Sequence, residues 1–202
     1  IRKANRLYIK GNLHGAIESF HTSLSMAKND TLRGELWGYI GDTYHAMGEA
    51  VRTKTDTTEY KIKINPKKAA QKCYEAYEKA LEIHYDNASV LNNYAYYLCE
   101  QGGDLEKAYE MSVKACELEP SNATYLDTKG WILYRLGRYE EAKPVMLQAV
   151  SLDKTGSTVL LMHYGDVLYA LGEEFMAGVY WRRALSGGHD PAEVNEKLKL
   201  LK

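Results

Sequence analysis

The chain repeats itself with a period of about 35 residues. Ala95, Gly130 and Gly165 each lie at the end of a short apolar stripe, and successive members of this series are 35 residues apart. A second marker, a pair of small residues seven positions apart such as Ala142 and Ala149, recurs with nearly the same period. A fixed period in this range is typical of stacked helical arrays, which present a long surface for binding. The repeat therefore predicts an all-α array and favours binding over catalysis.

Each repeat unit has the pattern of two amphipathic helices joined by a short turn. In the fourth unit Leu126, Gly130 and Leu133 fall on one helical face. Gly137 is expected to end this helix, because glycine tolerates the left-handed conformation of a C-cap. The second helix begins its own stripe at Ala142. Small residues on both stripes predict that the two helix axes approach closely.

Three segments resemble the tetratricopeptide repeat (TPR) family. Residues 37–44 have the pattern Trp-x-x-Ile-Gly-x-x-Tyr, residues 16–20 have Ala-x-x-x-Phe, and Pro120 occupies the family's proline position. The resemblance covers roughly residues 1–190. It implies a right-handed superhelical array of antiparallel helix pairs, the TPR solenoid.

We expect one array over residues 1–202, made of five helix pairs and a terminal helix. The first pair matches only the second half of its first helix, so the chain is expected to be a fragment of a longer protein. The terminal helix begins at Asp190-Pro191, an N-cap followed by a first-turn proline. It either caps the last pair, or is the first helix of a further unit or a dimer contact. The expected units are 1–30, 34–86, 88–121, 122–156 and 158–189, followed by the capping helix over 190–202.

The second unit carries an insertion of about 20 residues, placed at 49–65. The insertion is polar, rich in threonine, and ends in the alternating segment 60–64. Three interpretations stay open: extended helix ends that flank a loop, a short hairpin, or a disordered loop. Pro66 is expected to begin the following helix, because proline suits the first helical turn.

A second face of each first helix is not needed to pack the helix pair. In the fourth unit Asp127, Trp131 and Tyr134 lie roughly 80–140° around the helix from the Leu126 stripe. In TPR proteins, which the chain resembles, the equivalent face lines a concave groove that holds a peptide or a partner helix. These side chains either contact such a partner or pack between neighbouring first helices. The candidate groove residues are Asn92, Tyr96, Asp127, Trp131, Tyr134, Arg135, Met162, Asp166 and Tyr169.

Composition argues against two classes of partner. Lys and Arg total 26 against 27 Asp and Glu, with no basic block, so the clustered cations of a nucleic-acid interface are missing. No stretch approaches ~18 continuous apolar residues, so we expect no direct membrane span. The three cysteines show no CxxC spacing. They are expected to be small buried residues rather than metal ligands or disulfide partners.

Signatures of catalysis are missing from the sequence as well. No phosphate-binding loop, GxSxG or HExxH motif occurs. Two pairs, Asp42/His45 and His163/Asp166, place a carboxylate one helical turn from an imidazole. Pairs of this kind are ordinarily minor contacts on a helix surface. We therefore expect no enzyme, no metal site and no cofactor.

The leading hypothesis is a non-enzymatic scaffold that binds a peptide or partner protein in the concave groove. The alternative is a structural, self-associating module of a larger cell-envelope assembly, with a homodimer formed through the terminal helices. Residues 92–98 and 122–128 are similar to bacterial TPR proteins of the Bacteroidota type, many of which are cell-envelope lipoproteins. The unpaired cysteines favour a reducing compartment instead, so both a cytoplasmic and a cell-envelope location stay open.

Overall fold

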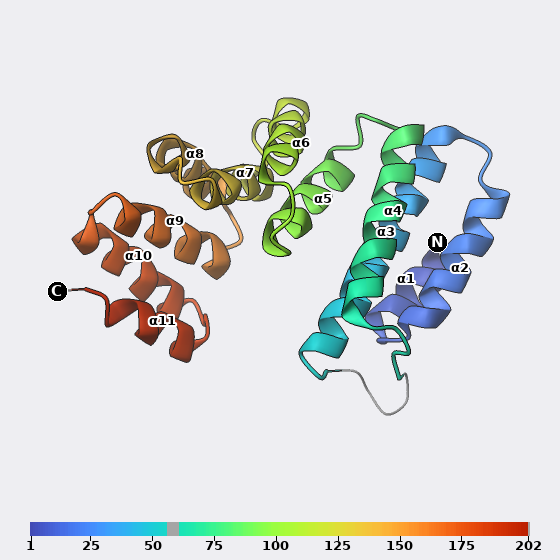
Figure 1. The fold of residues 1–202 in the computed structure, drawn as a ribbon, viewed down its shortest axis with the longest axis horizontal. Coiled ribbons are helices and arrows are strands. Elements are labelled where there is room, and N and C mark those ends of the chain that lie inside the picture. Colours follow the sequence, from blue (N-terminus) through green and yellow to red (C-terminus); the bar gives the residue numbers. More distant parts are fainter. Residues whose placement is uncertain (56–60, 202) are drawn as a thin grey trace. The chain divides into compact units, whose positions relative to one another are not determined.

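The structure is a computed structural model that describes residues 1–55 and 61–201. The described residues form eleven helices and no strand (Figure 1), which confirms the predicted all-α fold of paired helices. The helices are α1 (Arg2–Ile9), α2 (Leu13–Met26), α3 (Asp30–Arg52), α4 (Pro66–Ile83), α5 (Ala88–Glu100), α6 (Leu105–Leu118), α7 (Ala123–Arg135), α8 (Tyr139–Leu152), α9 (Thr158–Ala170), α10 (Glu174–Ser186) and α11 (Pro191–Leu198).

The chain divides into two compact units, Ile1–Tyr94 and Ala95–Lys202. The boundary falls inside α5, one residue before the small residue Ala95 that marks the repeat. The expectation of one array over residues 1–202 stays a prediction.

Short polar side chains begin most of the helices. Each such side chain accepts a hydrogen bond from a backbone N–H of the first helical turn, which would otherwise have no partner. The residues that cap in this way are Asn12, Asn29, Asn65, Asn87, Asp104, Asn122, Ser157 and Asp190. At the other end of α7, Gly137 has a φ of +75° in the left-handed region. The predicted glycine C-cap is therefore confirmed.

In the Ile1–Tyr94 unit the long helix α3 packs along α4. A Cβ added to Gly41 of α3 would lie 2.6 Å from the ring of Tyr77 on α4, so only glycine permits this crossing. Around it, Leu36 and Ile40 are fully buried together with Phe20 of α2. The close approach predicted from the small residues is thus present in this pair of helices.

The insertion lengthens α3 and then leads into α4. Helix α3 continues to Arg52, and α4 begins at Pro66 as predicted. Within residues 53–55 and 61–65 there is no strand, and Ile62 is buried against the core of the unit. The described part of the insertion agrees with extended helix ends that flank a loop; residues 56–60 lie outside the described residues.

The helix pairs of the Ala95–Lys202 unit meet at glycines. A Cβ on Gly130 of α7 would lie 2.7 Å from Met146 of α8, and one on Gly165 of α9 would lie 2.4 Å from Trp181 of α10. Helix α11 follows and packs on α10 (Figure 1). Val194 of α11 is fully buried. The terminal helix therefore covers α10, as expected of a capping helix.

All three cysteines, Cys73, Cys99 and Cys116, are buried and free, as predicted. Across residues 1–55 and 61–201, no group of three His, Cys, Asp or Glu side chains is placed to hold a metal ion. In the same ranges, no helix combines the length and the apolar character needed to cross a membrane.

Candidate functional site

Trp131 is the centre of the candidate site in the Ala95–Lys202 unit. Its ring stacks on Tyr134 of the same helix, at 4.9 Å between centroids, and on His163 of α9, at 4.0 Å. Its Nε1 donates a 2.8 Å hydrogen bond to the carboxylate of Glu100 at the end of α5. Trp131 is thus partly buried and contacts the neighbouring helices α5 and α9.

Arg135 lies beside Trp131 at the surface. Its guanidinium is 6.0 Å from the centre of the indole, and its Nη1 lies 3.3 Å from the Glu100 carboxylate. Glu100 therefore accepts hydrogen bonds from both the indole and the guanidinium. This shared carboxylate fixes an aromatic ring and a cation next to each other on one exposed face.

His163 pairs with a carboxylate from another helix. Its Nδ1 lies 2.9 Å from Oδ1 of Asp127 on α7. The expected surface contact between His163 and Asp166 within α9 is wrong. Both side chains are buried, and α7 offers His163 a carboxylate directly across the helix interface.

Asp166 is fully engaged elsewhere. Its Oδ1 accepts a 3.0 Å hydrogen bond from Nε1 of Trp181 on α10, and its Oδ2 lies 2.7 Å from Nζ of Lys197 on α11. Burial raises the pKa of the nearby Tyr134 hydroxyl, and the Asp166 carboxylate raises it further. Asp166 therefore joins three helices and presents no unbonded carboxylate oxygen.

The second intrahelical pair noted in the sequence was Asp42/His45, and Asp42 bonds to two other helices. Oδ1 of Asp42 accepts hydrogen bonds from Tyr77 of α4 and Asn93 of α5. The Nε2 of His45 instead lies 3.8 Å from Glu49, one turn further along α3. Glu49 lies on the same helix as His45, whereas the partner of His163 lies on another helix.

The candidate groove residues differ widely in exposure. Asn92, Met162 and Asp166 are buried, with 4%, 2% and 7% of their surfaces exposed. Asn92 belongs to the Ile1–Tyr94 unit and the rest to the Ala95–Lys202 unit. The candidates with accessible surface are Tyr96, Asp127, Trp131, Tyr134, Arg135 and Tyr169.

Sequence reasoning missed Glu100, His163, Trp181 and Lys197 as members of this cluster. One signal was available in the spacing. Trp131 lies 31 residues after its partner Glu100, and Lys197 lies 31 residues after its partner Asp166. Both pairs have a spacing about one helical turn shorter than the repeat, so a search at that spacing would have found both contacts.

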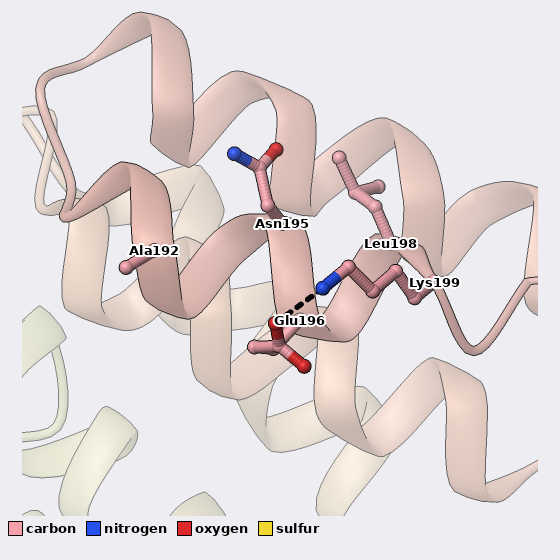
Figure 2. A pocket seen from close by; sticks show the side chains of 5 residues that line it. All are labelled: Ala192, Asn195, Glu196, Leu198 and Lys199. Carbon is pink, nitrogen blue, oxygen red and sulfur yellow. Dashed lines mark hydrogen bonds and ion pairs between the residues drawn. The ribbon is translucent and has the colours of Figure 1, made fainter.

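A separate depression lies on the outer surface of α11. Figure 2 shows the side chains that line it, which come from this helix and its C-cap residue Lys199, and shows Lys199 paired with Glu196. Because a single short helix supplies the whole lining, no groups converge from opposite sides on a ligand. We do not regard this depression as a functional site.

The fold and the repeated face define a class of protein, and comparison with known proteins agrees. Residues 123–155, which contain α7 and α8, match the tetratricopeptide repeat family. The chain carries a tetratricopeptide repeat and has the fold of TPR proteins. No curated protein sequence matches it.

Several solved structures share this fold. A tetratricopeptide repeat protein from Parabacteroides merdae is 18% identical, with a TM-score of 0.70 over 100% of this chain and 70% of that one. PilF of Pseudomonas aeruginosa is 22% identical, with a TM-score of 0.66 over 96% and 77%. YrrB, described as a TPR protein with an unusual peptide-binding site, is 16% identical, with a TM-score of 0.65 over 98% and 90%. At these identities the likeness establishes the fold.

Proposed function

We propose that the chain is a non-enzymatic scaffold that binds a peptide or partner protein through one face of α7 and α9. We call this the groove face and define it by Asp127, Trp131, Tyr134, Arg135 and Tyr169. The observation that carries the proposal is the fixed, partly exposed Trp131, whose N–H bonds to Glu100 and whose ring stacks on His163.

The chemistry of the groove face suits protein recognition. Trp, Tyr and Arg are the residues that most often dominate binding energy at protein interfaces. Here Trp131 and Arg135 lie side by side and share the Glu100 carboxylate. A side chain that is already fixed loses little conformational entropy when a partner binds, so more of the contact energy appears as affinity.

The titratable groups around the groove face support binding rather than catalysis. Asp166 uses both carboxylate oxygens for Trp181 and Lys197, and His163 is bonded to Asp127. These carboxylates and this imidazole are committed to contacts between helices. The related fold of YrrB, whose description includes a peptide-binding site, is consistent with this assignment.

The proposal is tested by partner capture with single variants. The chain is immobilised, exposed to an extract and washed, and the retained proteins are identified for wild type, Trp131→Ala and Arg135→Ala. We expect both variants to lose partners that wild type retains. The matched control is Phe175→Ala, which removes an 80% exposed ring from α10. It should retain the same partners as wild type.

Arg135→Ala keeps the test decisive if Trp131→Ala unfolds. Arg135 is exposed, and its ion pair with Glu100 contributes only ~0–1 kcal/mol to stability. Unchanged capture by folded Trp131→Ala and Arg135→Ala would refute the groove face. A wild-type dimer in light scattering that becomes a monomer in Arg135→Ala would instead assign the face to self-association.

A further inference from the structure

A small cleft lies in the Ile1–Tyr94 unit between α3 and the start of α5. Its lining includes Glu35, Gly38, Tyr39 and Asp42 from α3, with Ser89 and Asn93 from α5. Its volume is about 40 Å³. Sites for whole small molecules occupy ~300–1,000 Å³, so this cleft has room only for the end of one side chain.

The wall formed by α3 is acidic and follows one helical face. Glu35, Tyr39 and Asp42 lie at positions i, i+4 and i+7, and Glu35 and Tyr39 are exposed. Gly38 lies between them and has no side chain. A Cβ at Gly38 would lie 2.7 Å from Val90 of α5, so glycine lets the two helices meet at the base of the cleft.

Asp42 has one oxygen bonded and one without a donor. Tyr77 and Asn93 both donate to Oδ1, the latter at 3.0 Å. Among the described residues no donor lies on Oδ2. Burial raises the pKa of Asp42 above its usual value, more than these two hydrogen bonds lower it.

Within residues 1–55 and 61–201, the groups found to interact with Asp42 include no cation. Tyr8 of α1 and Cys73 of α4 interact electrostatically with it, and Tyr77 and Asn93 donate hydrogen bonds to it. Glu35, two turns earlier on α3, adds a second negative charge at the cleft. Buried carboxylates are ordinarily paired with a cation, because an unpaired buried charge is costly. A cation from outside the chain would supply the missing partner.

We infer that this cleft binds the ammonium group of a lysine side chain presented by a peptide partner. Asp42 forms the ion pair through Oδ2, Glu35 adds attraction at the rim, and the Tyr39 ring flanks the lysine chain. The compact ammonium matches the size of the cleft better than a planar guanidinium does. In naming a peptide as the source of the lysine, this inference rests on the proposed function, but it concerns a different site from the groove face.

The inference is tested by NMR titration of the ¹⁵N-labelled chain with two tripeptides. The probe is acetyl-Ala-Lys-Ala-amide, and the control is the same peptide with norleucine, which keeps the aliphatic chain and lacks the charge. We expect the lysine peptide to shift the amide signals of Gly38 and Asp42 and the side-chain amide of Asn93 in a saturable way. The norleucine peptide should leave these signals unchanged.

The decisive variant is Asp42→Asn. Its Oδ1 can still accept from Tyr77 and Asn93, while the oxygen without a donor becomes an NH₂ group, so the fold is preserved and the cation site is lost. Affinity for the lysine peptide should fall by at least ~10-fold, as for a buried charge pair that loses one partner. Glu35→Gln should weaken binding by about 2–3-fold, as expected for a rim charge. The control Glu18→Gln removes an exposed carboxylate from α2 and should have no effect.

Three results would overturn the inference: equal shifts with the norleucine peptide, unchanged affinity in Asp42→Asn, or lysine-dependent shifts confined to residues outside the cleft. None of them affects the groove face, whose test depends on Trp131 and Arg135. The two proposals can also fail separately in the other direction. If Trp131→Ala leaves partner capture unchanged but the lysine peptide still binds at Asp42, the groove face is refuted and the cleft is supported.

Discussion

The indole Nε1 of Trp181 donates a 3.0 Å hydrogen bond to Oδ1 of Asp166, within the buried interface of α9 and α10. Trp181 is 1% exposed and Asp166 is 7% exposed. The same carboxylate pairs with Lys197, so one buried group joins α9, α10 and α11. The capping helix is therefore tied to the last helix pair by polar as well as apolar contacts.

Trp181→Phe should destabilise the chain by ~2–4 kcal/mol. The change leaves Asp166 Oδ1 without its donor and creates a cavity where the larger ring was. Urea unfolding followed by circular dichroism measures the loss. Tyr180→Phe, which removes only a hydroxyl from the neighbouring position on α10, should cost less than ~1 kcal/mol. Equal losses for the two variants would show that the Trp181 to Asp166 bond contributes little.

Alanine at Gly165 should destabilise more than alanine at Gly130. A Cβ at Gly165 would lie 2.4 and 2.5 Å from the rigid, buried ring of Trp181, whereas one at Gly130 would lie 2.7 Å from the flexible side chain of Met146. We expect the free energy of unfolding to fall by ~2–3 kcal/mol for Gly165→Ala and by ~1 kcal/mol for Gly130→Ala. These values already include the stabilisation from the higher helix propensity of alanine. Denaturant unfolding of both variants gives the order, and the reverse order would contradict this account of the two crossings.

Asp42→Asn should stabilise the chain at neutral pH. Burial raises the pKa of Asp42 in the folded state, so between its usual pKa and the raised value the folded chain binds more protons than the unfolded chain. Stability therefore falls as pH rises through that window. Asparagine removes this penalty, and its advantage over wild type should shrink on acidification and vanish below the unfolded pKa of ~3.9. Urea unfolding between pH 7 and pH 3.5 measures the difference. A variant less stable than wild type at pH 7 would show that the ionised carboxylate stabilises the fold.

The three thiols should be unreactive in the folded chain. Burial raises the pKa of Cys73 to about 12 and that of Cys99 to about 11, and it raises the pKa of Cys116 as well. Thiolate is the reactive form, so at pH 8 both access and ionisation oppose reaction. Ellman's reagent should find almost no thiol in the native chain and three equivalents after unfolding in guanidinium. Rapid reaction of one native thiol would reveal local opening of its helix pair.

The repeat was enough to predict the small residues at which paired helices meet. Gly130 and Gly165 occupy the same position of successive units because α7 and α9 each meet the following helix there, where a larger side chain would collide. The C-cap at Gly137 and the helix starts at Pro66 and Pro191 also follow from local backbone chemistry. Such features depend on neighbours a few residues away or on a fixed period, so the sequence contains them.

The polar contacts of the candidate sites were decided by the tertiary structure. From the sequence, the expected neighbours were His163 with Asp166 and Asp42 with His45, because residues three apart lie close together on a helix surface. In the folded chain His163 pairs with Asp127 and Asp166 with Lys197, while Asp42 bonds to Tyr77 and Asn93. For His163, Asp166 and Asp42 the partner lies on another helix. Periodicity determines which face of each helix is buried, whereas the choice among polar neighbours across an interface exists only once the helices are packed.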